Sequence, residues 1–482
     1  MRQAFPMNLV IAPQSDDARL TRVALAARLR EILLSGQLTA RDPLPSTRVL
    51  ARAVGVSRTT VVAAYEELAG EGYVDMVPGS GTYVAEALSG TTAPRFERAA
   101  NAPDPPHPAS ARVPPVPSGI DMMPGSPSAH FDRNPDWARA WKSATAGTLP
   151  AVPPPAAGTP ELREEIAQHL RATRGVRCTA ENIVVTSGTN DGIALLVHAL
   201  RPRSGKYSIA TEDPGYPSAR SVIAVLGADP TPIPVSDGGI DVAHLRACDD
   251  PIAAALVTPS HQYPLGGRLP VAARLELLAW ARERQAFILE DDYDSEFRYG
   301  APPLPSIASL DEHHRVALLG SYSKTLTPWL RCGYLFVNNA ALLERIITVR
   351  AALGPSVSGA VQTALAHFHA SGGLRRHLMR VGRVYAHRRA LVLNAAHQFQ
   401  AKYRLSALEG GLHATITWRS GPSAETIVAE LAHRAIYAAP LHRYSHHPDA
   451  REQEGIVFGY GAPSDTQLQR GIDAIAEVLR AH

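Results

Sequence analysis

The 482-residue sequence has only three cysteines and lacks any apolar run of membrane-spanning length. Cys178, Cys248 and Cys332 stand alone, with no C-x-x-C pair and no histidine at ligand spacing, which excludes a disulfide framework and a structural zinc site. The N-terminal residues also lack the apolar core of a signal peptide. The sequence therefore predicts a cytoplasmic protein with no membrane partner.

Net charge is small as well. The 48 basic and 45 acidic side chains leave +3 at pH 7, which is too little to argue for nucleic-acid binding by itself. A DNA-binding prediction must therefore rest on local sequence. The length exceeds that of one ordinary domain, so we expect a large core domain and a smaller one.

Two apolar runs of strand length, 286–289 and 316–319, each end abruptly in polar residues. The first is followed by three successive acids, Glu290, Asp291 and Asp292, and the second by a cluster that ends in Lys324. Buried parallel strands have this pattern, and open α/β sheets place their chemistry at the carboxyl ends of such strands. The sequence therefore predicts an α/β fold with a functional site at this edge.

The polar cluster after the second run has the composition of a pyridoxal 5'-phosphate (PLP) site. Lys324 lies close to the hydroxyls of Ser321 and Ser323, and Arg331 follows seven residues later. This suits a lysine that forms a Schiff base with PLP, with the two serines and the arginine around the phosphate. A carboxylate would then pair with the pyridinium nitrogen.

The order Asp291, Tyr293, Lys324, Arg331 resembles fold-type I PLP enzymes of the aspartate aminotransferase kind. The stretches D-D-Y-D-S-E-F-R-Y and G-S-Y-S-K-T-L-x-P-x-x-R-x-G resemble in particular the regulator branch of that fold, the MocR-type members of the GntR family. The resemblance implies a large α/β domain with a mostly parallel sheet, a small C-terminal α+β subdomain from about residue 340, and a homodimer. It also implies Lys324 as the catalytic lysine, Asp291 on the pyridinium nitrogen, and Tyr293 in the cofactor site.

A predicted strand, 183–186, runs into Ser187-Gly188-Thr189-Asn190 and a helix over 191–200. Backbone N–H groups and the dipole at such a helix start can bind phosphate. This stretch resembles the family's phosphate cup, which implies that Gly188 and Thr189 contact PLP. Tyr216 resembles the aromatic residue near the cofactor ring in the regulator branch, with a core tyrosine as the alternative.

Three positions depart from the aminotransferase pattern. Tyr263 stands in place of an asparagine that bonds the phenolic oxygen of the cofactor, and Pro153 falls near the place of a partner-subunit tyrosine. Val457 aligns with the arginine whose planar fork binds a substrate carboxylate. Arg443 could substitute for that arginine, or it could be a solvated surface residue. The nearby histidines are expected to form a polar loop rather than a metal site: His442, His446 and His447.

Residues 18–85 have the pattern of a winged helix-turn-helix. We expect a helix over 19–35, two helices capped by Ser46 and Ser57, and a hairpin of strands 73–77 and 82–84. The words L-P-S-T-R-x-L-A, V-S-R-T-T-V and G-S-G-T-Y-V resemble the GntR-family DNA-binding domain. The resemblance implies contacts with double-stranded operator DNA from recognition-helix and wing residues: Arg48, Ser57, Arg58, Thr59, Gly79 and Gly81. A helical protein-interaction module is the alternative.

The proline-rich stretch 86–118 is expected to be a semi-rigid linker, followed by an aminotransferase-like effector domain over 119–482. The combination predicts a PLP-binding transcriptional regulator that senses PLP or a small amine or amino-acid effector. Two alternatives remain open at this point: a working aminotransferase with an accessory DNA-binding domain, and a PLP-storing protein without an operator.

Overall fold

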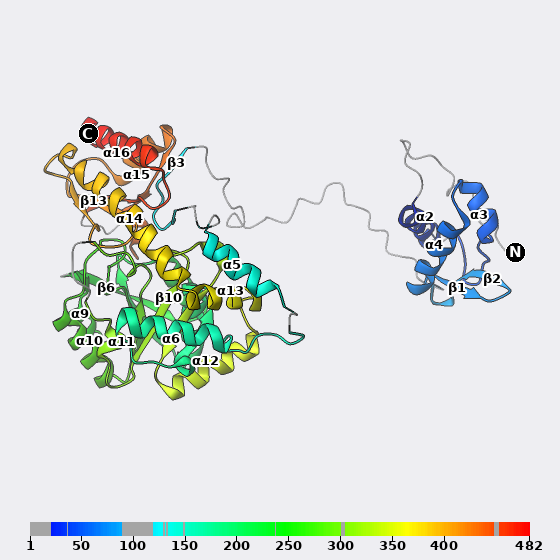
Figure 1. Cartoon of the computed structure of the whole chain (residues 1–482), viewed down its shortest axis with the longest axis horizontal. Helices are drawn as coiled ribbons and strands as arrows, with labels where there is room; N and C mark the ends of the chain where they lie inside the picture. The colour runs from blue at the N-terminus through cyan, green and yellow to red at the C-terminus, as the bar shows by residue number, and fades with distance from the viewer. Residues whose placement is uncertain are drawn as a thin grey trace. The chain divides into compact units, whose positions relative to one another are not determined.

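The computed structural model describes residues 21–35, 37–88, 119–128, 131, 134–147, 150–236, 238–299, 304–447 and 453–482. The chain divides into two compact units, Met1–Val113 and Pro114–His482 (Figure 1). Most of the stretch predicted as a linker lies outside the described residues. Its first three residues, Glu86–Leu88, form a 3-10 turn.

The N-terminal unit has three helices and a hairpin among its described residues: α2 (Arg22–Leu34), α3 (Thr47–Val54), α4 (Arg58–Gly70), β1 (Val74–Val77) and β2 (Gly81–Val84). Ser46 and Ser57 cap α3 and α4 by accepting hydrogen bonds from the backbone N–H groups of Val49 and Thr60, as predicted. The helices bury one face each around a shared core, which includes Leu25, Leu29, Val61, Tyr65 and Leu68. The winged helix-turn-helix prediction is therefore confirmed.

The larger unit is built on an eight-stranded sheet within the described residues, in the order β4-β11-β10-β9-β8-β5-β6-β7. These strands are β4 (Ile183–Thr186), β5 (Ser208–Asp213), β6 (Asp229–Ser236), β7 (Gly239–Ile240), β8 (Ile252–Val257), β9 (Phe287–Asp291), β10 (Val316–Ser321) and β11 (Gly333–Val337). The central pairs from β10 to β6 are parallel, whereas β11 runs antiparallel to both β10 and β4. The sheet is thus mostly parallel, as the two apolar runs predicted.

Both faces of this sheet are buried. Successive residues of one strand point into different cores: Ile183 and Val185 into one, and Val184 into the other. Helices cover the sheet: α5 (Pro135–Thr145), α6 (Pro160–Arg174), α7 (Thr189–Leu200), α8 (Pro217–Val225), α9 (Val242–Ala247), α10 (Val271–Glu283), α11 (Ile307–Leu310), α12 (Ala340–Leu353) and α13 (Gly359–Ala370). This burial on both faces explains why the strands are continuous apolar runs.

The C-terminal part of the larger unit, coloured orange to red in Figure 1, forms a small subdomain. Its antiparallel sheet has the order β12-β13-β16-β15 and packs with α14 (Gly373–Asn394), α15 (Ala424–His433) and α16 (Asp465–Ala481). The strands are β12 (Arg404–Ser406), β13 (His413–Trp418), β15 (Ala439–Pro440) and β16 (Glu454–Gly459), and a separate parallel pair joins β3 (Ile120–Asp121) to β14 (Ile436–Tyr437).

The core of the small subdomain begins later than the predicted boundary near residue 340. Helices α12 and α13 contribute buried residues such as Ile346 and Phe368 to the cores of the main sheet. The core of the small subdomain consists of Ile120 and Met122, near the start of the larger unit, and of residues from Val392 onward. Across the described residues, no helix combines the length and apolarity needed to cross a membrane.

Candidate cofactor site and DNA-binding surface

Strand order brings the predicted site residues together. Strand β11 lies between β4 and β10, with Gly333 opposite both Thr186 and Ser321. The loops that follow β4 and β10 are therefore neighbours, and a Cβ on Gly333 would come within 3.1 Å of the Gly188 Cα atom. Strand β9 runs parallel to β10, so its carboxyl end opens onto the same edge.

A cavity of about 340 Å³ lies at this edge. All nine residues predicted to bind the cofactor line it: Gly188, Thr189, Tyr216, Asp291, Tyr293, Ser321, Ser323, Lys324 and Arg331. Sequence reasoning missed other lining residues, among them Gly125, Asn190, Thr258, Asp294 and His413. The volume lies in the range of small-molecule sites.

One end of the cavity is suited to a phosphate. Gly188 precedes α7 with a φ of +113°, and nothing lies within 4 Å of the position that a Cβ would occupy. The start of α7, the hydroxyls of Ser321 and Ser323, and Arg331 line the cavity. The exposed Arg331 side chain makes no hydrogen bond or ion pair with another residue in the described part of the chain. A helix start, hydroxyls and a free guanidinium together form an anion site.

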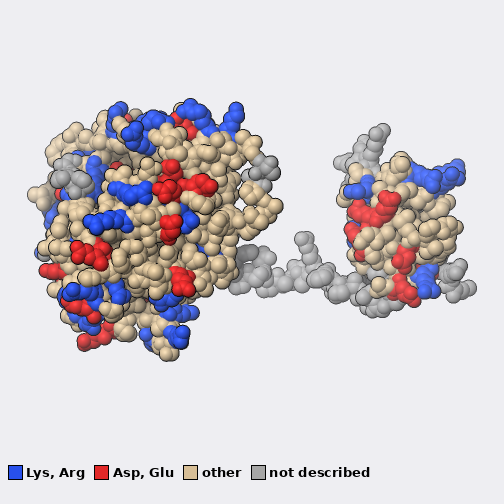
Figure 2. All heavy atoms as spheres, turned by 60° about the horizontal axis from the view of Figure 1, so that its bottom comes forward, with Lys and Arg blue, Asp and Glu red and all other residues tan. Residues whose placement is uncertain are grey.

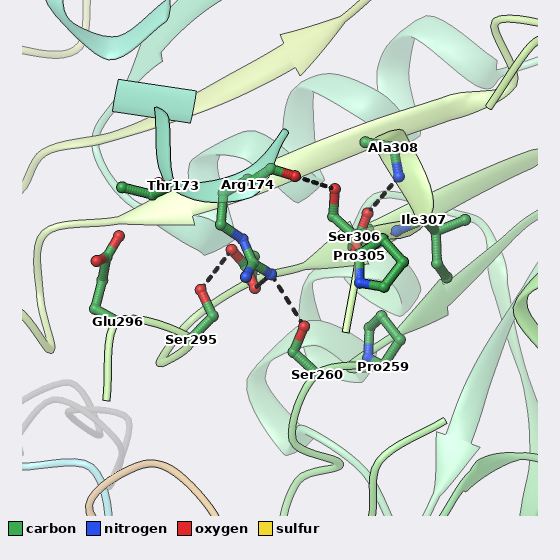
Figure 3. Close-up of polar contacts among 12 residues, drawn as sticks. Thr173, Arg174, Pro259, Ser260, Ser295, Glu296, Pro305, Ser306, Ile307 and Ala308 are labelled. Carbon is green, nitrogen blue, oxygen red and sulfur yellow. Dashed lines mark hydrogen bonds and ion pairs between the residues drawn. The ribbon is translucent and has the colours of Figure 1, made fainter. Parts of the chain in front are cut away.

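The three successive acids at the end of β9 have different partners. Glu290 is buried and accepts hydrogen bonds from the backbone N–H groups of Ile307 (3.0 Å) and Ala308 (2.8 Å). Asp292 forms a buried ion pair with Arg174, at 2.7 Å between Oδ1 and Nη2. Figure 3 shows Arg174 also pointing to Ser260, to which it donates a hydrogen bond of 3.1 Å. These two acids are thus held by the protein itself.

Asp291 differs from both neighbours. Its side chain lies in the cavity wall and is 5% exposed, yet its Oδ1 atom has no hydrogen-bond partner among the described residues. Burial, followed by the charge of Asp292, raises the pKa of this carboxyl to about 8. A buried oxygen without a donor is costly. Asp291 therefore fits a ligand that brings a cationic N–H group, as the ring nitrogen of PLP does.

Lys324 projects into the same cavity from the loop after β10. Burial lowers the pKa of its amine, while the carboxylates of Asp294 and Asp291 act in the opposite direction. Its Nζ donates a hydrogen bond of 2.5 Å to the carbonyl oxygen of Gly125. A lowered amine pKa favours the neutral nucleophile that a carbonyl compound requires.

Aromatic side chains form the wall of the cavity that surrounds Tyr263. The ring of Tyr263 lies 6.3 Å from that of Tyr216 and 5.7 Å from that of Tyr293, with both pairs edge to face. Tyr293 donates a hydrogen bond to the carbonyl oxygen of His261. Burial lowers the pKa of His413 well below its ordinary value, so its imidazole is neutral at pH 7. This part of the wall is therefore aromatic, and its imidazole carries no charge at pH 7.

One group outside the prediction has the composition of a metal site: His261, Asp294 and His413, whose ligand atoms lie within 4.8 Å of one another. His261 Nδ1 is 2.7 Å from Asp294 Oδ2, a hydrogen-bond distance. His413 Nε2 donates to the Pro264 carbonyl oxygen. These contacts already use one nitrogen of each ring. The histidines predicted to form a polar loop lie elsewhere, and His446 is hydrogen-bonded to Thr211.

The N-terminal unit separates its arginines into two groups. Arg22, Arg30 and Arg41 form ion pairs with acids of the same unit. No ion pair joins the exposed Arg48, Arg52 and Arg58 to an acid within the described residues, and Arg58 is 3.3 Å from the Thr47 hydroxyl. In Figure 2 the largest group of Lys and Arg side chains of this unit stands apart from its acids. The second group lies on α3 and at the start of α4.

The six residues predicted to contact DNA are all exposed: Arg48, Ser57, Arg58, Thr59, Gly79 and Gly81. Ser57 is engaged in capping, because its Oγ accepts from Thr60 N and lies 2.7 Å from the Thr59 hydroxyl. Gly79 and Gly81 adopt φ values of +76° and +138° in the turn of the hairpin. Arg52 was missed, although it lies one turn after Arg48 on α3.

Comparison with known proteins agrees with the division of the chain into a small N-terminal unit and a larger unit. Residues 126–442 match the family "Aminotransferase class I and II", and residues 21–84 match "Bacterial regulatory proteins, gntR family". The "HTH-type pyridoxine biosynthesis transcriptional regulator PdxR" of Corynebacterium glutamicum is 37% identical, over 94% of this chain and 95% of that protein. The "Probable rhizopine catabolism regulatory protein MocR" of Rhizobium meliloti is 30% identical, over 95% and 93%. This chain belongs to the MocR-type GntR-family regulators.

Solved structures support the fold of the larger unit of this MocR-type regulator. An archaeal alanine:glyoxylate aminotransferase has a TM-score of 0.69 at 21% identity and covers 75% of this chain and 91% of its own. A kynurenine aminotransferase of Pyrococcus horikoshii has a TM-score of 0.68 at 20% identity, with the same coverage. The fold-type I prediction is confirmed, and PLP is the cofactor of this fold and family.

The departures from the aminotransferase pattern can now be located in the MocR-type fold. Val457 is fully buried in β16 and packs with Ala439, Leu441 and Tyr444, with Tyr263 against this cluster. It offers no donor to a ligand. Arg443 is exposed and does not line the cavity, and Pro153 is exposed.

Proposed function

We propose that this MocR-type regulator holds PLP on Lys324 and that the ligand state of this site changes binding to operator DNA by the winged helix. Gly188, Thr189, Ser321, Ser323 and Arg331 would hold the phosphate, Asp291 the ring nitrogen, and Tyr216 and Tyr293 the ring. When bound, PLP supplies an electrophilic aldehyde and an electron-withdrawing ring. The protein's own part is to lower the pKa of the Lys324 amine by burial and to enclose the site.

The observation that carries this proposal is the state of Asp291. Of three successive acids, it is the one that combines a place in the cavity wall with an unpartnered oxygen. A cationic ring N–H would satisfy that oxygen and would favour the ionised carboxylate through charge. The neighbouring Glu290 and Asp292 already have partners, so they do not compete for this role.

The effector and the assembly belong to the same proposal. The name of the relative PdxR refers to pyridoxine biosynthesis, which favours PLP itself over an unrelated amine as the effector. A homodimer is part of this proposal as well, and Trp329, which is 91% exposed next to the cavity-lining residue Pro328, is a candidate contact for the second subunit.

The test is to reduce the PLP-treated protein with borohydride and to locate the label by mass spectrometry. The yellow, reducible adduct should form on the peptide that contains Lys324 and disappear in Lys324→Ala. The matched control is Lys142→Ala, which removes an exposed lysine of α5 and should leave the adduct intact. An adduct that persists in Lys324→Ala would place the attachment elsewhere.

DNA binding is tested on the same preparation. Operator fragments are selected from genomic DNA by the full-length protein, and their affinity is measured with and without PLP. The proposal expects at least a severalfold change in affinity. Equal affinity with and without PLP would contradict the sensing role.

Catalytic transamination is not expected from this site, because a substrate carboxylate needs a clamp. The position of that clamp is the buried Val457, and the imidazole in the aromatic wall carries no charge at pH 7. Incubation with a panel of amino acids and 2-oxo acids should show no repeated turnover. Turnover at about 1 per second or faster, an ordinary enzyme rate, would favour the aminotransferase alternative.

A further inference from the structure

The backbone at Gly125 is pressed against the cofactor lysine. Its carbonyl oxygen accepts a hydrogen bond of 2.5 Å from Lys324 Nζ. A Cβ built on Gly125 would lie 2.5 Å from the same nitrogen, and the φ of this residue is +98°. The dihedral favours glycine here, whereas a methyl group at this position would displace the flexible end of Lys324. Within the described residues, this carbonyl is the one hydrogen-bond acceptor that holds the Lys324 amine.

Gly125 belongs to a segment, residues 119–128, that is tied to the small subdomain. Strand β3 pairs with β14, and the Met122 N–H donates to the Tyr437 carbonyl oxygen at 3.0 Å. The Met122 carbonyl oxygen in turn accepts from the Gly459 N–H at 2.7 Å. At the far end of the segment, the Ser128 N–H donates to the Tyr385 hydroxyl at 2.8 Å. Gly125 thus lies between two hydrogen-bonded points of the segment, Met122 and Ser128, and contacts Lys324.

The same segment is the first described part of the larger unit. It follows residues 89–118, which connect it in the chain to the GntR-type domain. Any change in the backbone around Gly125 therefore occurs in the stretch where the connection from the DNA-binding domain enters the larger unit. The site of cofactor attachment and this entry are joined by one hydrogen bond.

We propose that the Gly125 carbonyl holds the Lys324 amine in the cofactor-free protein and loses it on attachment of PLP, so that segment 119–128 reports whether the lysine is occupied. This rests on the proposed attachment of PLP to Lys324. In that step a carbon–nitrogen double bond forms and the carbon–oxygen bond of the aldehyde breaks. The two hydrogens of the neutral amine leave with the aldehyde oxygen as one water molecule. The nitrogen then keeps at most one hydrogen, which the phenolic oxygen of the cofactor would accept, so Gly125 would lose its donor.

The neighbouring charges do not replace this contact. Asp294 and Asp291, which also line the cavity, act on Lys324 through their charge. The Gly125 carbonyl is neutral and depends on the N–H group itself. Attachment therefore changes the hydrogen bonding of the 119–128 backbone more directly than that of the carboxylates.

Hydrogen exchange of the full-length protein, read by mass spectrometry on peptides that cover residues 119–128, tests this inference. Saturation with PLP should raise the exchange rate of this segment about fivefold, the factor expected from one net hydrogen bond of about 1 kcal/mol. Lys324→Met should show the raised rate without PLP and should not respond to PLP. Lys142→Met is the matched control and should behave as the unchanged protein.

The outcomes separate this inference from the proposed function. If the yellow adduct forms but exchange in 119–128 stays constant, the inference is wrong and the proposed function stands. If no adduct forms, the proposed function fails, and Lys324→Met against the cofactor-free protein still tests the contact with Gly125. Equal exchange in those two proteins would overturn the inference. Gly125→Ala adds a second test, because its methyl group should displace the amine and raise exchange without PLP.

Discussion

The winged helix and the cofactor cavity both have polar groups without a protein partner, but these groups are exposed in the first and buried in the second. On the winged helix, Arg48, Arg52 and Arg58 are exposed and have no acidic partner among the described residues. In the cofactor cavity, an unpartnered oxygen belongs to the carboxyl group of Asp291, which is 5% exposed. Water solvates the arginines at little cost to stability, whereas the Asp291 oxygen is buried and receives no hydrogen bond from the described residues.

This difference teaches how each region responds to its ligand. DNA replaces water and counterions around charges that were already satisfied, so its binding should depend strongly on salt and leave the fold unchanged. By our proposal, a cofactor in the cavity would instead pair with a buried oxygen that has no donor among the described residues. Ligand binding at the second region should therefore be visible in folding stability, and mutations there should change stability and affinity together.

The largest effect is expected where a buried charge is already paired. Asp292→Asn leaves the Arg174 guanidinium buried without its carboxylate, which should lower the free energy of unfolding by about 3 to 5 kcal/mol. Urea denaturation measures this. The control is Glu164→Gln, which breaks an exposed ion pair with Arg171 on the same helix and should cost less than about 1 kcal/mol. Equal losses would mean that burial is not what distinguishes the two pairs.

The next effect concerns the unpartnered carboxylate. Asp291→Asn removes the charge that would meet the ring nitrogen, so the affinity for PLP should fall by about 10- to 100-fold, the factor for one charged hydrogen bond. Titration of the absorbance of the bound cofactor measures this affinity. The cofactor-free variant should be at least as stable as the unchanged protein. A variant that loses stability and keeps its affinity would show that Asp291 is a structural residue.

A comparable change is expected on the winged helix, but without any change in folding. Arg58→Ala should weaken operator binding by about 1 to 3 kcal/mol and relax base preference at one position, if Arg58 reads a guanine edge. Its melting temperature should not change. Arg22→Ala is the matched control, because Arg22 is paired with Glu67 on the same unit. A uniform loss across unrelated sequences would instead assign Arg58 to a phosphate.

The smallest effect is a pH dependence of the cofactor-free protein. Burial raises the pKa of Asp291 to about 8, while the unfolded chain has an ordinary carboxyl. Between about pH 4 and pH 8 the folded protein keeps a proton that the unfolded chain has lost, so stability falls as pH rises. Asp291→Asn should remove this slope and so gain about 1.4 kcal/mol at pH 7 relative to pH 6, the value for one proton over one pH unit. Thermal unfolding at the two pH values checks this, and parallel curves would contradict it.

The sequence predicted most fully the parts whose residues are close together in the chain. Ser46 and Ser57 as caps, and Lys324 with Ser321, Ser323 and Arg331, each lie within a few residues, where local spacing determines the geometry. Gly125 and His413 were missed because they reach the cavity from distant segments. No local pattern records that β13 and the segment after β3 meet the loop of Lys324.

The partners of Glu290 and Asp292 at the end of β9 were also beyond sequence reasoning. Arg174 reaches Asp292 from the end of α6, and the backbone of α11 reaches Glu290. The family resemblance had already singled out Asp291, and these long-range contacts show why its two neighbours are not free for a ligand. The subdomain boundary near residue 340 was placed too early for a related reason, since α12 follows the sheet in sequence and returns to pack on it.

Helix α14 is one continuous helix that joins the core of the main sheet to the core of the small subdomain. Leu374 at its start belongs to the core of the main sheet, and Val392 near its end belongs to the core of the small subdomain. Eighteen residues of helix between these two anchors span roughly 27 Å, so a tilt of about 5° at the first would displace the second by about 2 Å. Tyr385, whose hydroxyl holds the Ser128 N–H, lies between them and would move by a smaller amount. The helix is thus a lever arm that converts small rotations at one core into ångström displacements at the other.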